Sequence, residues 1–369
     1  MNILMVSNEF PPGVGGVQTH VYELSRALVQ LGHRVRVLCR HRDKSVPARE
    51  TSDGIEVERL ALPDNHLLYD WLLRRRLRQL IRAEGFQLIH VHGMRPLKAT
   101  ARLNVPVLFT NHTSSFVRRA DGSRKTRRKM CRQLQHVAEV LTPSEILADK
   151  TRVIGYAGPV TFIPNGVDNR LFSPGPSDLR SQLHIPADAF VIAIACRLEP
   201  VKGVRHLARA VAAIDDPRLH LVIAGEGSEY ADIQQILLRK VQSGHAHLLG
   251  SVDNREMPRI YRGADASALP SLMEATSIAG LEAMACGLPV IGSDVGGIPY
   301  IVRHGKNGLL VTPESSDELQ QAIEQLLAQP QRCRDMGEQA IQMVDSEFTW
   351  RHVAEKVHSH YGAHFKKYT

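Results

Sequence analysis

Arg197 and Lys202 are the residues whose types and spacing suggest chemistry most directly. They stand in the segment Arg197-Leu-Glu-Pro-Val-Lys202-Gly203, which follows an apolar run at residues 190–196 that is typical of a buried strand. An arginine fork and a lysine point charge together suit the oxygens of a diphosphate. Neutralising a departing diphosphate is most of what sugar transfer from a nucleotide carrier requires, although an ordinary solvent-facing pair of cations is the alternative.

Two acidic residues form the second candidate group. Glu274 stands just before a predicted helix that starts near Thr276 and Ser277, and Glu282 lies within it. Free amides at the start of this helix, at Ser277 and Ile278, can face a ligand. The two carboxylates could hold hydroxyl groups of a sugar and a ribose, whereas an N-cap beside a surface charge is the plainer alternative. The predicted buried stripe of this helix consists of Ile278, Leu281 and Ala285.

Histidines follow two predicted strands of the first half. His90 and His92 end a strand near residues 88–91, and Thr110-Asn-His112 ends another at 107–110. A lone core histidine is usually structural, but two at neighbouring strand ends are candidates for polar contacts to a transferred sugar. The sequence contains no Asp-x-Asp pair. We therefore predict no metal, and cationic side chains with helix termini would take its place.

Glycines precede the first predicted helix, in the segment Gly13-x-Gly15-Gly16. Backbone amides at such a loop can approach a phosphate, and the helix N-terminus adds positive potential, although a tight strand-to-helix turn explains the glycines equally well. The dinucleotide spacing fails because position 18 is Gln, and no Gly-Lys-Ser/Thr follows. Both absences weaken a nicotinamide or ATP site.

The composition is that of a soluble globular protein. The 369 residues suffice for two domains, the hydrophobic share is 43%, and the five cysteines show no paired spacing, so a reducing cytoplasm is the expected compartment. The net charge of +8 is unevenly distributed, because residues 71–132 contain 16 Lys and Arg against two acids. This segment forms a solvated basic face, or it binds an anionic membrane surface or an anionic acceptor. Nucleic acid is the less favoured partner, since no recognition signature accompanies the charge.

The order of elements predicts an α/β fold of two doubly wound Rossmann-like domains facing across a cleft. Strands alternate with helices in each half, which implies parallel sheets covered on both faces. A segment rich in turn formers, beginning Ile163-Pro-Asn-Gly-Val-Asp168, separates the halves. We place the domains at 1–165 and 166–349, with a C-terminal helix at 350–369 that packs back on the first. The loops at the carboxyl ends of the strands should line the cleft.

Four blocks of the chain carry a resemblance to a known family. The chain resembles the retaining glycosyltransferases of the GT-B fold, family four, and the order and spacing fit over nearly its whole length. The last block, which ends Gly287-Leu-Pro-Val-Ile-Gly-Ser-Asp-Val-Gly-Gly297, is very specific. The other blocks are Pro12-Gly-Val-Gly-Gly-Val-Gln-Thr-His20, the segment 163–168, and the segment 197–203.

The resemblance implies a role for each matched residue. In the first half, Gly16 would offer its amide to the donor phosphate, Gln18 and His20 would contact the acceptor, and His112 would touch the transferred sugar. In the second half, Arg197 and Lys202 would clamp the diphosphate of the donor, and Glu274 would contact the sugar. The turn amides of Ser277 and Ile278 would also belong to the donor site, and Glu282 would bind the ribose. The implied catalytic set is His112, Arg197, Lys202 and Glu274.

One departure affects the turn after the first acid. Many relatives have Phe-Gly or a similar pair where this chain has Thr276 and Ser277. Backbone amides at this turn usually meet the sugar hydroxyls, so the departure puts the shape of the turn and the choice of sugar in question.

The resemblance implies a retaining transfer of a hexose-type sugar from a UDP- or GDP-linked donor, without cofactor or metal. The implied partners are a nucleotide sugar and a glycan or lipid-linked acceptor of bacterial envelope glycan, lipopolysaccharide or glycolipid synthesis. We predict a cytoplasmic protein. Because the segment 67–81 is apolar and rich in arginine, we also expect it to lie at the inner face of an anionic membrane. The alternatives are a nucleotide-sugar epimerase and an inactive nucleotide-sugar-binding protein of the same fold.

Overall fold

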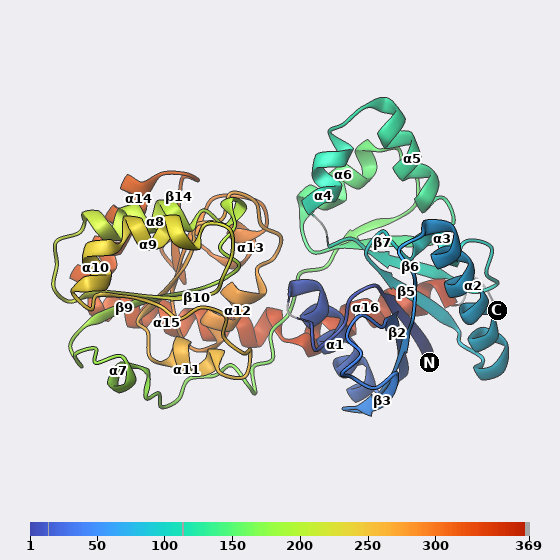
Figure 1. The fold of residues 1–369 in the computed structure, drawn as a ribbon, viewed down its shortest axis with the longest axis horizontal. Coiled ribbons are helices and arrows are strands. Elements are labelled where there is room, and N and C mark those ends of the chain that lie inside the picture. The colour runs from blue at the N-terminus through green and yellow to red at the C-terminus, as the bar shows by residue number, and fades with distance from the viewer. Residues whose placement is uncertain (14, 113, 366–369) are drawn as a thin grey trace. The chain divides into compact units, whose positions relative to one another are not determined.

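The computed structural model describes residues 1–13, 15–112 and 114–365, and the chain divides into two compact units. The first unit contains Met1–Gly166 together with the segment from Trp350 onward, and the second contains Val167–Thr349. In each unit, parallel strands lie between helices (Figure 1). The predicted fold of two doubly wound α/β domains is therefore confirmed.

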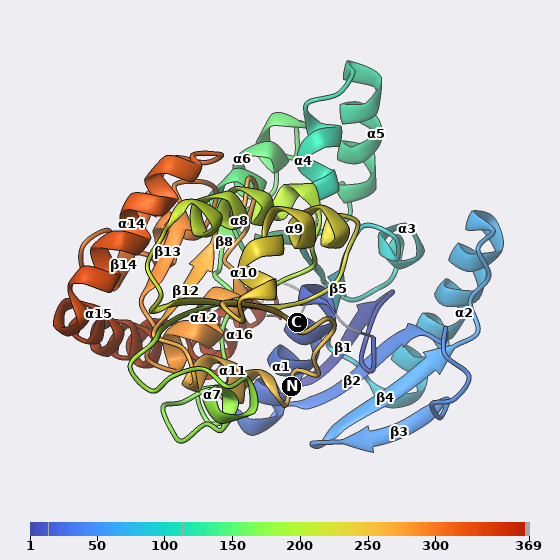
Figure 2. The same ribbon diagram turned by 60° about the vertical axis from the view of Figure 1, so that its left-hand side comes forward.

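The sheet of the first unit has eight strands within the described residues, in the order β3-β4-β2-β1-β5-β6-β7-β8. Neighbouring strands are parallel except for β3, which pairs antiparallel with β4 at one edge (Figure 2). Their bounds are β1 Asn2–Ser7, β2 Arg34–Arg40, β3 Arg49–Ser52, β4 Ile55–Leu60, β5 Leu88–His92, β6 Val107–Thr110, β7 Glu139–Thr142 and β8 Val160–Phe162.

The antiparallel edge corrects the expectation of a wholly parallel sheet. The turn between β3 and β4 consists of Asp53 and Gly54, with φ values of 50° and 76°. Two successive residues with positive φ make the tight turn that matches the twist of a β-hairpin. A two-residue hairpin needs no crossover helix, so β3 breaks the alternation of strands and helices.

Helices cover both faces of this sheet. Apolar residues of β1, β5 and β6 form one core with the buried side chains of α2, α4 and α5, while α1 packs against α16. The helix α1 ends at Gln30 with Leu31 as its C-cap, and Gly32 follows with φ 84°, a left-handed conformation that favours glycine after a helix. The bounds are α1 Gly16–Gln30, α2 His66–Glu84, α3 Leu97–Thr100, α4 Ser114–Ala120, α5 Arg124–Leu134, α6 Glu145–Val153 and α16 Trp350–Phe365.

Buried polar contacts fasten the C-terminal helix α16 to the first unit. Glu139 of β7 accepts hydrogen bonds from His364 at 2.8 Å and from Thr161 at 2.7 Å, and it lies 2.9 Å from His360. The Tyr361 hydroxyl lies 2.6 Å from Nδ1 of His90. The helix α16 therefore belongs to the first unit, although the whole second unit separates the two in sequence.

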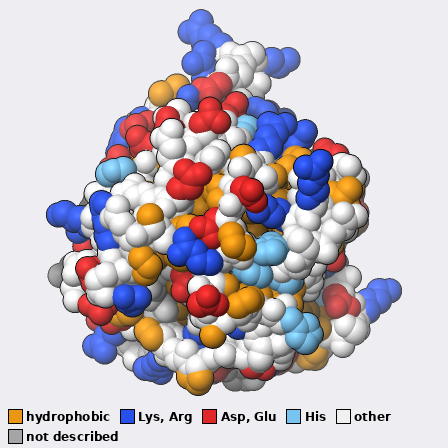
Figure 3. Space-filling model, turned by 90° about the vertical axis from the view of Figure 1, so that its left-hand side faces the viewer, with side chains coloured by type: hydrophobic (Ala, Val, Ile, Leu, Met, Phe, Trp, Pro, Cys, Tyr) orange, Lys and Arg blue, Asp and Glu red, His pale blue; other side chains and the backbone are white. Residues whose placement is uncertain are grey.

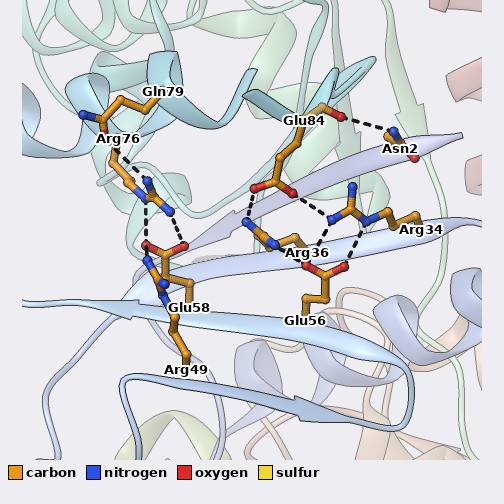
Figure 4. A network of polar contacts seen from close by, with 9 residues as sticks. All are labelled: Asn2, Arg34, Arg36, Arg49, Glu56, Glu58, Arg76, Gln79 and Glu84. Atoms are coloured by element: carbon orange, nitrogen blue, oxygen red, sulfur yellow. Dashed lines mark hydrogen bonds and ion pairs between the residues drawn. The ribbon is translucent and has the colours of Figure 1, made fainter. Parts of the chain in front are cut away.

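A network of ion pairs joins the end of α2 to the strands β2 and β4 (Figure 4). Arg36 pairs with both Glu56 and Glu84, and Arg34 reaches the same two carboxylates at 2.9 and 2.8 Å. A hollow of about 510 Å³ lies against this network, and its walls include these charges. Because the charges already neutralise one another, we do not take this hollow for an anion site.

The sheet of the second unit has six parallel strands within the described residues, in the order β11-β10-β9-β12-β13-β14. Numbered from its first strand, this is the 3-2-1-4-5-6 order of a Rossmann fold. The bounds are β9 Phe190–Ala195, β10 Leu219–Ala224, β11 Ala246–Leu248, β12 Ala266–Leu269, β13 Val290–Ser293 and β14 Gly308–Val311.

Alternate residues of the central strand β9 enter two cores on opposite faces of this sheet. Ile192 and Ile194 pack with α8, α9 and α14, whereas Val191 and Ala193 pack with α11, α12 and the end of α15. Figure 1 shows these two sets of helices on either side of the strands. The helices are α7 Leu179–Gln182, α8 Val204–Ala213, α9 Tyr230–Ile236, α10 Leu238–Gln242, α11 Met257–Arg262, α12 Ile278–Ala285, α13 Ile298–Ile301, α14 Ser316–Ala328 and α15 Pro330–Met343, with a 3₁₀ turn at Pro200–Lys202 and a π turn at Val344–Phe348.

The helix α12 differs from the predicted one-sided stripe. Every residue from Gly280 to Cys286 is buried, including Glu282, whereas Ile278 is only half-buried. A helix that is apolar nearly all round is a core helix, covered here by α11, α15 and the sheet. Leu281 and Ala285 are buried as predicted, but burial is not confined to one stripe, because the small residues between the large ones allow close approach on every side.

The described part of the chain contains no helix with the length and apolarity needed to span a bilayer.

We predict that Glu139 makes the first unit sensitive to acid. Burial by itself would raise the pKa of Glu139, but hydrogen bonds from Thr161 and His364 and the nearby His360 outweigh burial and lower the pKa below 4.5. The ionised group therefore stabilises the fold above the unfolded-state pKa, and this contribution is lost as the pH falls through the folded-state pKa. Glu139→Gln should cost about 1.5–3 kcal/mol near pH 7, measured by urea unfolding.

The pH dependence provides the check. Between about pH 6 and pH 3 the variant should lose less stability than the parent chain, because it has no charge left to neutralise. The exposed Glu145→Gln is the matched control and should follow the parent curve. Parallel curves for the parent and Glu139→Gln would contradict the assignment.

Candidate functional site

The residues singled out by the sequence fall into two groups, one in each unit, and each group lies at the carboxyl ends of parallel strands. In the first unit they surround the ends of β1, β5 and β6, and in the second the ends of β9 and β12. In both sheets the strand order reverses here, between β1 and β5 and between β9 and β12. Such a switch point is where open α/β sheets bind ligands.

In the second unit, a close backbone contact brings the cationic loop against the acidic loop. Gly203 has φ 63°, and a Cβ built on it would lie 2.0 Å from the carbonyl oxygen of Pro270. The amide of Leu272 donates to the carbonyl oxygen of Val201 at 2.8 Å. Only glycine fits this approach, so the glycine of the Arg197–Gly203 segment positions the lysine before it.

Lys202 and Glu274 form an ion pair in this structure. The Lys202 ammonium lies 2.5 Å from Oε2 of Glu274, which also accepts from the Ser271 hydroxyl at 3.3 Å. The side chains are 21% and 15% exposed, so the pair is accessible from outside. The structure thus brings together the lysine predicted for the diphosphate and the acid predicted for the sugar, but as partners of each other.

Arg197 presents a free positive charge in the same loop as Lys202. Its residue is exposed, and in the described part of the chain no carboxylate lies within ion-pairing distance of its guanidinium. Arginine carries its charge at any physiological pH, so this group stands ready for an anion.

The turn after Glu274 leads into the N-terminus of α12. Ser277 is the N-cap and accepts a hydrogen bond from the Gly280 amide at 3.3 Å, and no acidic residue occupies the first turn. The earlier amides of the helix have no intrahelical acceptor and carry partial positive charge. Gly297 donates to the Glu274 carbonyl at 3.0 Å, which holds the turn in place even with Thr276 and Ser277 in it.

Glu282 is more deeply buried than Glu274, and its charge affects Tyr261, a residue that the sequence analysis did not single out. Glu282 is 6% exposed, on the buried helix α12. Burial and the charge of Glu282 raise the pKa of Tyr261 well above 10, and among the described residues the Tyr261 hydroxyl has no hydrogen-bond partner. An isolated tyrosine in the sequence offers no signal of this, because an ordinary core aromatic looks the same.

In the first unit, the glycine loop leads into α1 without a side-chain cap. Gly15 is the N-cap, and Gly16 begins the helix. A Cβ added to Gly16 would meet no atom of the described residues beyond its chain neighbours and its own helix backbone within 4 Å, whereas one added to Gly15 would lie 2.8 Å from Oε1 of Gln18. Gln18 therefore folds back over the loop and leaves the amide end of α1 uncapped.

Three histidines converge near this loop. His20 of α1 lies with its ring centre 4.4 Å from that of His112 and 5.5 Å from that of His92. Nδ1 of His92 lies 3.1 Å from Nε2 of His112, and Nδ1 of His20 lies 2.9 Å from Oδ1 of Asn165. His20 and His92 are buried, so His20, predicted to contact the acceptor, is oriented by protein contacts here.

Burial keeps these histidines neutral. It lowers the pKa of His20 to about 4, against a smaller opposing effect of the Asn165 hydrogen bond, and holds the pKa of His92 and His112 well below 6.5. His90 is different in kind, since its two nitrogens contact Tyr361 and Thr110 in the core. We therefore interpret His90 as structural and the other three as the polar group of the first unit.

One face of the molecule carries charges of both signs. On the face drawn in Figure 3, acidic and basic side chains are interspersed. This face therefore has no broad field of one sign.

Two Rossmann-like units in one chain, with polar side chains and helix N-termini at the carboxyl ends of their strands, define a glycosyltransferase of the GT-B type. The family models agree: the model described as Glycosyltransferase Family 4 matches residues 14–171, and the model described as Glycosyl transferases group 1 matches residues 177–343. The chain therefore belongs to this family of glycosyltransferases, and the resemblance inferred from the sequence is confirmed.

Named relatives align with most of the chain. A D-inositol 3-phosphate glycosyltransferase of Stackebrandtia nassauensis is 28% identical, over 94% of this chain and 86% of its own length. A human phosphatidylinositol N-acetylglucosaminyltransferase chain is 26% identical, over 98% of this chain and 75% of its own length.

Solved structures share the fold. Sucrose-phosphate synthase from Thermosynechococcus elongatus superposes with a TM-score of 0.86 at 25% identity, over 99% of each chain. Anabaena HepE, solved in complex with UDP-glucose, superposes with a TM-score of 0.82 at 22% identity, over 98% of this chain and all of its own. The second likeness shows the fold alone.

Gly16 gives a test that separates folding from function. Because an added Cβ meets no protein atom, Gly16→Ala should leave thermal stability unchanged or slightly raised. If the Gly16 amide meets a donor phosphate, the methyl group would displace that phosphate and lower the transfer rate by about 100-fold. Gly362→Ala in α16, which has equal room, is the matched control and should keep full activity. A fully active Gly16→Ala would remove Gly16 from the site.

Proposed function

We propose that the protein transfers a hexose-type sugar from a nucleoside diphosphate to an acceptor hydroxyl with retention of anomeric configuration. The observation that carries the proposal is the arrangement in the second unit, where Lys202 of the loop that contains the free Arg197 pairs with Glu274, just before the start of α12. A nucleoside diphosphate sugar has the complementary groups, namely a pyrophosphate for the cations and hydroxyls for the acids.

In this proposal, donor binding breaks the Lys202–Glu274 ion pair and replaces it with one contact of each side chain to the donor. The pyrophosphate takes the Lys202 ammonium, and the released Glu274 carboxylate accepts hydrogen bonds from the sugar hydroxyls. Arg197 and the amides around Ser277 and Ile278 add positive charge where the leaving group develops negative charge. Glu282 holds the ribose hydroxyls. These cations do the work that a divalent metal performs in other transferases, so we propose that no metal is required.

The chemical step breaks the bond between the anomeric carbon and the diphosphate oxygen and forms a bond from the same face to the acceptor oxygen. The diphosphate oxygen takes the proton of the acceptor hydroxyl, so no separate base and no covalent enzyme intermediate are needed. Gly16 contributes its amide to the donor phosphate, Gln18 and His20 line the acceptor, and neutral His112 accepts or donates a hydrogen bond at the transferred sugar.

The names of the relatives suggest where to look for the acceptor. They refer to D-inositol 3-phosphate and phosphatidylinositol. Phosphorylated cyclitols, free or attached to lipid, are therefore the first acceptors to test, and glycans of bacterial envelope, lipopolysaccharide or glycolipid synthesis follow. The donor nucleotide is UDP or GDP in this proposal.

A donor panel and one variant test the proposal. Thermal shifts with UDP, GDP and ADP should identify one stabilising nucleotide, and NMR of the product should show the donor's anomeric configuration. Lys202→Met should lower turnover by about 100- to 1,000-fold, because the leaving diphosphate loses one of its two cations. The exposed Lys306→Met in the same unit is the matched control and should retain full turnover. An inverted product, or a Lys202→Met enzyme at parental rate, would refute the mechanism.

We also propose that the start of α2 binds an anionic membrane surface. The helix buries Leu73, Leu77 and Leu80, but three apolar side chains of its first turns point to solvent: Leu67, Leu68 and Trp71 are 73%, 47% and 55% exposed. The Arg75 guanidinium lies 5.6 Å from the Trp71 ring centre, so cationic and apolar groups share this surface. Such pairing suits insertion among anionic headgroups.

Vesicle sedimentation tests this surface. The parent protein should bind phosphatidylglycerol vesicles more tightly than phosphatidylcholine vesicles, and salt should weaken the binding. Leu67→Ala with Trp71→Ala should weaken it by about 10-fold or more through lost apolar burial. Leu238→Ala, an exposed leucine of the second unit, should change nothing. Equal binding to both lipids would argue against a membrane role.

A further inference from the structure

Three histidines that are far apart in sequence meet at one point of the first unit. His20 comes from α1, His92 ends β5, and His112 follows β6. The sheet places the last two side by side, because His92 of β5 pairs in register with Thr110 of β6. One ring nitrogen from each histidine lies within 4.8 Å of the other two.

We propose that His20, His92 and His112 bind a divalent transition metal ion of the Zn²⁺ type, each through one imidazole nitrogen. Zn²⁺ bonds imidazole at about 2.0–2.1 Å with tetrahedral geometry, so ligand nitrogens lie about 3.4 Å apart. Nδ1 of His92 and Nε2 of His112 are already 3.1 Å apart. A side-chain adjustment of His20 would complete a three-histidine site, with the fourth position left for water.

The contacts of His20 leave one of its nitrogens available as a ligand. Its Nδ1 donates to Oδ1 of Asn165 at 2.9 Å, which leaves Nε2 as the atom with a lone pair. This Nε2 is buried and has no hydrogen-bond partner among the described residues. An outer hydrogen bond from the far nitrogen to a carbonyl oxygen is the arrangement that fixes metal-binding histidines.

The ligand set selects the metal. The group consists of imidazoles alone, which suit Zn²⁺, Co²⁺, Ni²⁺ and Cu²⁺, whereas Mg²⁺ and Ca²⁺ require oxygen ligands. A second cluster of histidines, in the second unit, does not provide such a group. His220 stacks on His245 and His247, and both nitrogens of His245 already contact Ser243 and the Pro217 carbonyl.

A direct hydrogen bond between His92 and His112 is the competing explanation of the 3.1 Å contact. That bond leaves Nε2 of His20 without a partner, whereas a bound ion would occupy it. In either case Nε2 of His92 stays unsatisfied, so only metal binding itself separates the two explanations.

Metal binding would compete with sugar contact at His112, a consequence that rests on the proposed function. The nitrogen that faces His92 would be held by the ion and could not serve the transferred sugar. Zn²⁺ should therefore inhibit transfer, and a chelator should restore it. Metal binding without inhibition would refute the sugar role of His112 but leave the metal site standing.

Competition with a chromophoric chelator, on protein without a histidine tag, tests the site directly. The parent protein should take up one tight equivalent of Zn²⁺, and Co²⁺ should give the visible absorption of a tetrahedral site. His112 is half-buried, so the substitution His112→Asn should leave the core intact, and it should abolish tight binding. Asn165→Ala should weaken it by about 10- to 100-fold, because His20 loses its orienting partner.

The controls distinguish Zn²⁺ binding at this three-histidine site from Zn²⁺ binding by other histidines of the protein. His245→Asn with His247→Asn should leave the tight equivalent in place, and millimolar Mg²⁺ should not displace Zn²⁺. Circular dichroism checks that each variant is folded. The proposal is overturned if His112→Asn and Asn165→Ala both bind Zn²⁺ as the parent does, or if the second-unit variant loses the tight site.

Discussion

All parallel strands of a sheet end at the same edge, and both groups of polar residues depend on that constraint. In the second unit it brings the loop after β9 against the loop after β12, although 72 positions separate Lys202 from Glu274. In the first unit it brings His92 beside the residues that follow β6. Glycine makes the approach close enough, because Gly203 lies where any Cβ would overlap a carbonyl oxygen.

The two units solve the same electrostatic problem in opposite ways. The second unit keeps charges at its strand ends and neutralises most of them by pairing, with Arg197 left free for an anion. The first unit keeps its histidines uncharged by burying them, which removes water from the protonated form. The charged group suits a leaving diphosphate, and the neutral group suits hydrogen bonding or metal coordination.

Much of the fold could be predicted because periodicity reports burial directly. The strands predicted at 107–110 and 190–196 are present as β6 Val107–Thr110 and β9 Phe190–Ala195. The hairpin of β3 and β4 was missed because polar edge strands carry little apolar signal, and its Asp-Gly turn was not recognised. The all-round burial of α12 was missed because helical periodicity describes one face, whereas the neighbouring elements decide how many faces are covered.

The sequence by itself determined the family, the order of the elements and the residue types of the candidate site, since these depend on local pattern and motif spacing. Only the tertiary structure decided which of those residues touch. It paired Lys202 with Glu274, set Tyr261 under the influence of Glu282, joined His90 to α16 and gathered His20, His92 and His112. Contacts between distant segments depend on strand order and on the burial that desolvates each side chain, and neither quantity is encoded in the spacing of residues along the chain.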